Sequence, residues 1–225
     1  MTIKSLSTFR SSLVLVLLVI FCPLAIDIYL PAFVNIATSL SVTNSDVKLT
    51  ISLFMVSVGI AQLILGPLSD KYGRKPIILF GLVIFFFGSV VAAMSDTIYG
   101  VVFGRALQGT GAIASAVLAL AADLSREEQR PKVMATIGMF IGLSFTLAMV
   151  FGPIVAEAFG LSGLFWFTAI LTVFAMVMIQ FMVPNSVNKA PKGDSVALPE
   201  QLSKLIRHPE LSRLNWGVFI LHMAL

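Results

Sequence analysis

The stretch VKLTISLFMVSVGIAQLILGPLSDKYGRKPIILFGLVIFFFGSVVAAM, residues 47–94, decides the fold class. It holds two apolar runs, Val47–Leu65 and Ile77–Met94, on either side of a short polar loop. The apolar residues are continuous and do not alternate with polar ones, which favours helices over the strands of a barrel. Each run suffices to cross a hydrocarbon core of about 30 Å, which takes about 20 helical residues. The stretch therefore predicts two transmembrane helices joined by a short loop.

The composition of the whole chain agrees with this. Of its 225 residues, 58% belong to the set AVILMFWYC and 12% are charged, and the mean hydropathy is +0.98. Soluble domains average roughly 45–50% apolar and about 25% charged residues. The composition excludes a soluble or disordered protein, and the single cysteine, Cys22, excludes a disulfide scaffold. The formal net charge is +4, and the charged residues lie between the apolar runs. We therefore expect an integral membrane protein in contact with the lipid bilayer and no nucleic-acid partner.

Six apolar runs predict an all-α integral membrane bundle, and they cover Leu13–Phe33, Val47–Leu65, Ile77–Met94, Ile98–Ala122, Val133–Ala156 and Ser162–Val183. A seventh run starts at Leu214 and is too short to span by Leu225, so we expect the chain to be part of a longer protein. The predicted organisation is a cytoplasmic N-terminus (1–12), a six-helix transmembrane bundle (13–183), a cytoplasmic linker (184–213) and the start of a truncated seventh helix (214–225).

Basic residues predict the orientation. Lys and Arg concentrate in the loops on one side of the bundle, whereas the other side carries Lys48 alone. The positive-inside rule therefore places the N-terminus in the cytoplasm. Within the linker, apolar residues recur at helical spacing from Leu198 to Ile206, which indicates either an amphipathic helix on the inner membrane surface or a solvated loop.

Two charged residues lie deep inside the predicted spans, where each costs about 2.5–3.5 kcal/mol on insertion scales and usually faces a cavity or a partner. Asp27 and Arg105 fall at similar depth in the outer half of the bundle, counting 1.5 Å per helical residue. We expect them to meet across a central cavity, with Gln108 one turn from Arg105 on the same face.

This pair has a functional and a structural interpretation. In the first, Asp27 is a titratable carboxylate from which a cationic substrate expels a proton, and Tyr29 supplies an aromatic wall for a lipophilic cation. In the second, the pair is an ion pair that only fixes helix packing, or Asp27 reaches the outer interface. No metal-ligand cluster and no catalytic residue is expected.

The polar loop reads Gly66-Pro67-Leu68-Ser69-Asp70-Lys71-Tyr72-Gly73-Arg74-Lys75-Pro76. It resembles the loop motif of the major facilitator superfamily, G-x-L-[AS]-D-[RK]-x-G-R-[RK], at every specified position. Glycine suits a tight reversal or a close helix approach. The resemblance implies a gating motif, a cytoplasmic charge network that latches one conformation, made of Gly66, Asp70, Gly73, Arg74, Lys75 and Asp123.

Two further motifs are similar to those of this family. Arg105-Ala106-Leu107-Gln108-Gly109 resembles R-x-x-Q-G, whose arginine is associated with proton coupling. Gly152-Pro153 is similar to the antiporter motif G-x-x-x-G-P-x-x-G-G, although Ala148 stands at its first glycine and Ala156-Glu157 at its last pair. A bend is expected at Pro153. The partial match leaves both antiport and symport open.

The opening Asp27-Ile28-Tyr29-Leu30-Pro31, followed later by Leu53-Phe54, resembles the Bcr/CflA group of drug–proton antiporters. By contrast, Gly104–Asp123 and Val183-Pro184-Asn185-Ser186 resemble YajR-type transporters. The resemblance implies the N-terminal six-helix bundle of the major facilitator fold, a 3+3 inverted repeat. It also implies a C-terminal six-helix bundle as partner, a bacterial inner membrane, and the proton gradient in place of any cofactor.

The leading hypothesis is therefore proton-coupled efflux of drugs or other small lipophilic compounds by alternating access. A proton-linked importer of a small metabolite, with Asp27 and Arg105 holding the substrate, is an alternative on the same fold. More remote alternatives are a non-transporting membrane protein and an intramembrane protease. The protease would use Ser162 of Gly160-Leu161-Ser162-Gly163 with His208 or His222 as its base.

Overall fold

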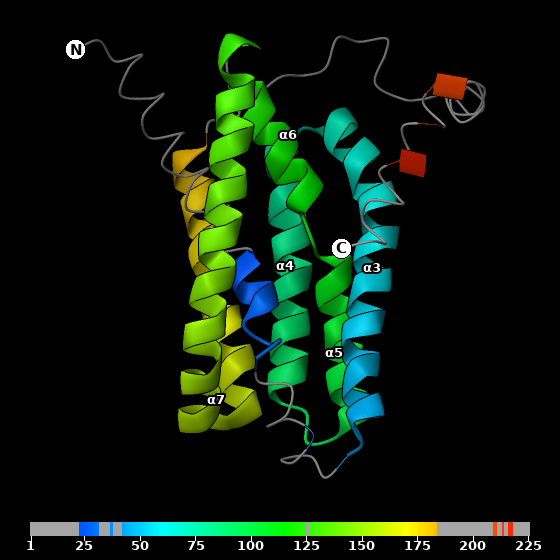
Figure 1. Cartoon of the computed structure of the whole chain (residues 1–225), viewed down its shortest axis with the longest axis vertical. Helices are drawn as coiled ribbons and strands as arrows, with labels where there is room; N and C mark the ends of the chain where they lie inside the picture. The colour runs from blue at the N-terminus through cyan, green and yellow to red at the C-terminus, as the bar shows by residue number, and fades with distance from the viewer. Residues whose placement is uncertain are drawn as a thin grey trace. The chain divides into compact units, whose positions relative to one another are not determined.

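The computed structural model of the chain describes residues 23–31, 37, 42–124, 127–183, 209–210, 213 and 216–217. The chain divides into two compact units, Met1–Lys189 and Ala190–Leu225. The first unit holds the helices α3 to α7 (Figure 1). Four predicted parts of the chain lie wholly or mostly outside the described residues. They are residues 1–12, the linker, its amphipathic helix and the seventh run.

Helices α3, Asn44–Tyr72, and α4, Arg74–Ala93, form the hairpin that the first two quoted runs predict. Thr43 and Asp46 cap the start of α3 with reciprocal side-chain to backbone hydrogen bonds, which satisfy two N–H groups. At the other end of α3, Gly73 adopts φ +97°, a conformation that favours glycine, and α4 begins at the next residue. A single residue therefore joins the two helices.

The run at residues 98–122 was expected to form one helix, and the structure corrects this. Helix α5 covers Ile98–Thr110 and helix α6 covers Ala114–Leu124, with a break at residues 111–113. Two glycines, Gly109 and Gly111, disfavour helix here by about 1 kcal/mol each relative to alanine. Gly111 also lies against α4, since a Cβ placed on it would approach the backbone nitrogen of Phe85 to 2.4 Å.

Helix α7, Arg130–Met182, follows a short 3₁₀ turn at Glu127–Gln129 and has 53 residues. A straight helix of that length would measure about 80 Å, far more than one membrane crossing requires. Gly160 interrupts it with φ 67° and ψ −167°. Ile137 and Ile179 share one apolar cluster, and Ala156 and Leu164 share another. The two arms of α7 therefore lie side by side, and both predicted runs fall within it (Figure 1).

The first predicted span is described only from Pro23 to Pro31. Residues 23–27 are helical, whereas 28–31 form a turn and a bend. The helix was expected to continue to Phe33, so its end is corrected within the described part. The residue before a proline is biased away from helical geometry, which accounts for an interruption before Pro31.

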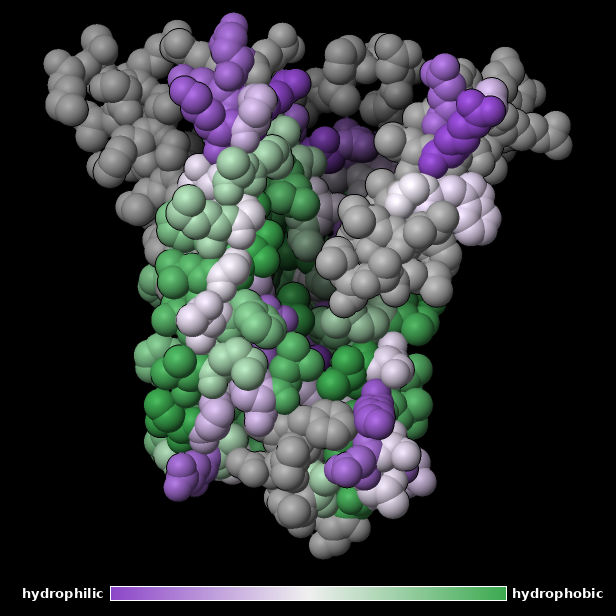
Figure 2. Space-filling view, viewed as in Figure 1, coloured by the Kyte–Doolittle hydropathy of each residue, from purple (hydrophilic) through white to green (hydrophobic). Residues whose placement is uncertain are grey.

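Four helical segments of the described residues are long and apolar enough to cross a membrane, namely Asn44–Tyr72, Arg74–Ala93, Ile98–Asp123 and Arg130–Phe181. The third of these segments combines α5 with α6 across the break. Large apolar side chains such as Leu63, Phe103, Ile170 and Phe181 are exposed along them. Figure 2 shows apolar side chains covering the middle of this face of the helices, with polar residues gathered towards their ends. This is the surface of an integral membrane protein.

Candidate functional site

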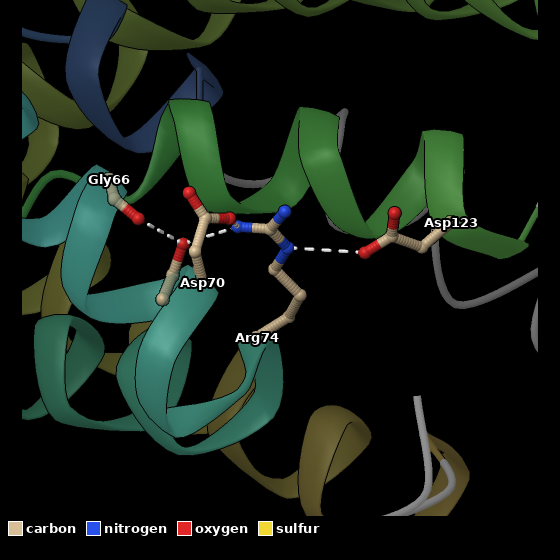
Figure 3. A network of polar contacts seen from close by, with 5 residues as sticks. Gly66, Asp70, Arg74 and Asp123 are labelled. Carbon is tan, nitrogen blue, oxygen red and sulfur yellow. Dashed lines mark hydrogen bonds and ion pairs between the residues drawn. The ribbon is translucent and has the colours of Figure 1, made fainter. Parts of the chain in front are cut away.

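The end of α3, the start of α4 and the end of α6 build a charge network around Arg74 (Figure 3). Arg74 forms an ion pair with Asp70 in the last turn of α3, and its Nε lies 3.1 Å from Oδ2 of Asp123 at the end of α6. Its Nη1 donates to Oγ of Ser69 over 2.6 Å, and that hydroxyl donates to the carbonyl oxygen of Gly66 over 2.7 Å. The structure thus brings together Gly66, Asp70 and Arg74 of the loop motif and Asp123, the further member expected for the charge network.

Lys75, next to Arg74, has a role that the sequence does not reveal. Its Nζ donates to the carbonyl oxygens of Gln180 and Val183, over 2.9 and 2.8 Å. The last carbonyls of a helix lack intrahelical partners, and a cation near them also interacts favourably with the helix dipole. Lys75 therefore holds the C-terminal end of α7 against the start of α4.

Arg105 is buried in the interior of the helices, where it is 2% exposed. Its Nη1 donates to Oε1 of Gln108, one turn along α5, over 2.9 Å. Gln108 Nε2 in turn donates to Oγ of Ser89 on α4 over 2.7 Å, and that hydroxyl donates to the carbonyl oxygen of Phe85 over 2.9 Å. The Nε of Arg105 has no hydrogen-bond partner within the part of the chain that the structure describes. A hydrogen-bonded chain therefore fixes one edge of the guanidinium.

Close backbone packing between α4 and α5 sets the geometry of this series of hydrogen bonds. A Cβ placed on Gly88 of α4 would lie 2.5 Å from the backbone nitrogen of Gln108 and 2.8 Å from the carbonyl oxygen of Gly104. Small residues allow helices within a membrane to approach this closely. The short side chain of Ser89, beside Gly88, can therefore reach Gln108 directly.

Two aromatic rings cover the guanidinium of Arg105. Its Cζ lies 4.6 Å from the ring centroid of Tyr29 and 4.1 Å from that of Phe54 on α3. The hydroxyl of Tyr29 donates to Oγ1 of Thr50 over 2.8 Å, because the Thr50 hydroxyl itself donates to the carbonyl of Val47. Sequence reasoning named Tyr29 as an aromatic wall for the substrate, whereas it quoted Phe54 only for a family resemblance and missed its contact with Arg105.

Asp27 lies in the same region, two residues before Tyr29, whose ring contacts the guanidinium of Arg105. The two side chains do not meet as expected, since among the described residues the ion pairs within 4.0 Å are Arg74–Asp70 and Arg74–Asp123. Arg105 contacts aromatic rings and Gln108 instead. The half-buried carboxylate of Asp27 makes no hydrogen bond within the described segments.

Gly152 and Pro153 of α7 lie against the segment that carries Asp27. A Cβ on Gly152 would lie 2.5 Å from Cγ of Pro31 and 2.8 Å from the carbonyl oxygen of Ile28. Pro153 lies within α7, which the structure assigns as helical on both sides of it. The glycine of the antiporter-like motif thus permits a backbone contact with the turn directly after Asp27.

An apolar cavity of about 110 Å³ lies between the same elements. Its walls include Pro23 and Ile26 ahead of Asp27, Phe85 of α4, the α5–α6 break and Thr172 of α7. The Thr172 hydroxyl donates to the carbonyl oxygen of Thr168, so it offers the cavity little free hydrogen-bonding capacity. The cavity suits an apolar group close to, but not in contact with, a carboxylate.

The residues of the protease alternative do not assemble a site within the described segments. The Ser162 hydroxyl donates to the carbonyl oxygen of Ala93 over 2.6 Å, and His208 and His222 lie outside the described residues. The described part of the chain also contains no group of three or more His, Cys, Asp or Glu residues that would bind a metal.

The comparisons with known proteins agree on one family. Residues 15–225 match the family model described as Major Facilitator Superfamily. The chain is 44% identical over 179 residues to the inner membrane transport protein YajR of Escherichia coli K12, covering 80% of this chain and 39% of that protein. It is 31% identical over 185 residues to a bicyclomycin resistance protein homolog of Haemophilus influenzae, covering 81% of this chain and 46% of that protein. The chain thus spans less than half the length of these relatives.

A solved structure shows the same fold. The human organic anion transporter MFSD10 superposes with a TM-score of 0.66 at 22% identity, covering 89% of this chain and 56% of that one. At this identity the likeness concerns the fold alone. The relatives and the structural neighbour are membrane transporters and not enzymes, which removes the protease alternative.

Proposed function

The chain belongs to the major facilitator superfamily, and from that premise we propose that it is part of a proton-coupled exporter of drugs or other small lipophilic compounds. The relationship to a bicyclomycin resistance protein homolog supports export of drugs. We further propose that residues 13–183 form the six-helix N-terminal bundle, followed by a linker and the start of a seventh helix. A second six-helix bundle would complete the transporter. The proposed location is a bacterial inner membrane with the N-terminus in the cytoplasm.

The observation that carries the proposal is that the carboxylate of Asp27 is unpaired within the part of the chain that the structure describes. Asp27 is near a buried cation but not paired with it among the described residues, and residues just ahead of it line an apolar cavity. A cationic or polarised substrate that enters there would favour the ionised carboxylate, whereas protonation would release the substrate. Competition of this kind for one carboxylate is sufficient to couple export to proton entry.

The energy available to such an exchange is ample. One elementary charge crossing a potential of 100 mV corresponds to about 2.3 kcal/mol, before any pH gradient is counted. No cofactor is needed for a transporter driven in this way. In alternating access the substrate site lies between two bundles that rock around it, so this chain would supply half of the site.

The network around Arg74 is the proposed gate. It joins the ends of α3 and α6 through Asp70 and Asp123, and Lys75 adds the end of α7. A latch built from charges at helix ends can open and close without disturbing the apolar core. We assign these residues to the choice of conformation rather than to the substrate.

Proton movement in inverted membrane vesicles tests the proposal. Vesicles containing the full-length transporter are acidified by respiration and then challenged with lipophilic cations or neutral drugs while a pH-sensitive dye is followed. We expect drug-triggered proton release in the parent and none in Asp27→Asn at matched expression. Equal release in both would remove Asp27 from the coupling step, and uptake of a metabolite together with protons would favour the importer.

A further inference from the structure

We infer that Phe54, together with Tyr29, is a positioning residue that holds Arg105 against two aromatic rings and so keeps Asp27 free of an ion pair. The inference rests on the proposed function, because it explains how a carboxylate can remain available for protons and substrate beside a buried cation. In the sequence, Leu53-Phe54 contributes to the resemblance to the Bcr/CflA group, but that resemblance gives Phe54 no role beside Arg105.

The rings take the place of a counter-ion for Arg105. Phe54 is 1% exposed and Arg105 2% exposed, so the contact between ring and guanidinium is almost entirely removed from solvent. The Cζ of Arg105 lies 4.1 Å from the Phe54 ring centroid and 4.6 Å from the Tyr29 centroid. Both distances are within the range of about 6 Å in which the face of an aromatic ring attracts a cation.

The rings are themselves fixed by α3. The hydroxyl of Tyr29 is bonded to Thr50, one turn before Phe54 on the same helix. The backbone of Phe54 touches α5, since a Cβ on Gly109 would lie 2.5 Å from the carbonyl oxygen of Phe54. Helix α3 therefore anchors the ring of Tyr29 and carries the ring of Phe54. It also approaches α5 one turn away from Arg105.

Without the rings, attraction between opposite charges would draw Arg105 to Asp27. Around the two charges, the described titratable or charged groups are Asp27 and Tyr29 on the first segment and Arg105 on α5. The neighbouring elements contribute uncharged side chains, namely Thr50 and Phe54 of α3, Ser89 of α4 and Phe165 of α7. No other described charge in this cluster competes for either partner.

Replacing Phe54 by leucine tests the inference in the full-length transporter. The change keeps an apolar side chain but removes the ring, so Arg105 becomes free to pair with Asp27. We expect the pH profile of drug-triggered proton release in inverted vesicles to move about one unit towards lower pH. The reason is that a nearby positive charge lowers the pKa of a carboxyl group by about 1–3 units. Phe54→Tyr keeps the ring and should retain the parental profile.

The matched control is Leu65→Val, which trims a buried apolar residue of the same helix that packs with Ala61 and Ile77. It should leave the pH profile unchanged. If Phe54→Leu is not recovered in the membrane, Tyr29→Leu removes the other ring and should give the same shift, measured against the same Leu65→Val control.

The outcomes separate this inference from the proposed function. The inference is supported if Asp27→Asn loses proton release, Phe54→Leu shows a shifted pH profile and Phe54→Tyr keeps the parental pH profile. An unshifted profile in Phe54→Leu, whatever its rate, would overturn the positioning role while leaving proton coupling by Asp27 intact. Full release in Asp27→Asn would overturn the proposed function, and the inference with it.

Discussion

Removing the ammonium of Lys75 should loosen the C-terminal end of α7. The change Lys75→Met retains the apolar stem of the side chain and deletes the donor that bonds the carbonyls of Gln180 and Val183 over 2.9 and 2.8 Å. Each hydrogen bond from a charged group contributes about 1.5–3 kcal/mol. Lys75 is only 9% exposed, and these contributions already include the cost of desolvation. Because the two bonds share one ammonium, their contributions do not add. We therefore expect a net cost of about 1–3 kcal/mol for local opening.

The assay is cysteine labelling of the last turns of α7 in the full-length transporter. Ile179, which is 0% exposed, is replaced by cysteine in a Cys22→Ser background, so that a water-soluble maleimide reacts only when this end opens. We expect Lys75→Met to raise the labelling rate about 5- to 100-fold, since 1.4 kcal/mol corresponds to a factor of ten. Lys71→Met is the control, because Lys71 is exposed and lies over the ring of Tyr72. Equal labelling rates in Lys75→Met and Lys71→Met would refute the capping role.

Two further changes test other contacts. Gly152→Val should destabilise the protein by about 1–3 kcal/mol, as overpacking does, because even a Cβ there would lie 2.8 Å from the carbonyl oxygen of Ile28. Thermal unfolding should show no comparable loss of stability for Gly138→Val, because nothing lies within 4 Å of a Cβ at Gly138. Equal losses in the two variants would contradict the contact. Asp70→Asn removes an ion pair of Arg74 worth about 0.2–1 kcal/mol at a partly exposed site. It should change the ratio of inward- to outward-open forms by up to about fivefold, and unchanged spin-label distance populations would reduce the loop motif to a folding role.

The charge network of the loop was predictable because its members are close in sequence or lie at helix ends. Asp70 and Arg74 are separated by one short loop, and Asp123 ends a span whose length places it at the same depth. The contact between Arg105 and Gln108 follows from helical spacing alone. The expectation for Arg105 and Gln108 uses only the period of the helix. The members of the charge network were named from the resemblance of the loop to the family motif, and the span length placed Asp123 at their depth.

The contacts that the sequence did not reveal join distant segments through ordinary residues. Phe54 is one of many phenylalanines, and an apolar residue in a span can face lipid or protein equally well. Lys75 looks like a basic loop residue, yet its bonds reach carbonyls more than a hundred positions away. The expected meeting of Asp27 and Arg105 failed for a related reason. Depth along a span places two charges at one level, but it does not tell which other groups surround them.

The most direct test of proton coupling is proton release from the purified full-length transporter in weakly buffered detergent solution. Addition of a transported drug should release protons from the parent protein, because substrate and proton compete for the carboxylate of Asp27. Asp27→Asn should release none, while Glu157→Gln, a change at an exposed carboxylate of α7, should behave as the parent does. Drug binding without proton release in the parent, or equal release from parent and Asp27→Asn, would contradict the account.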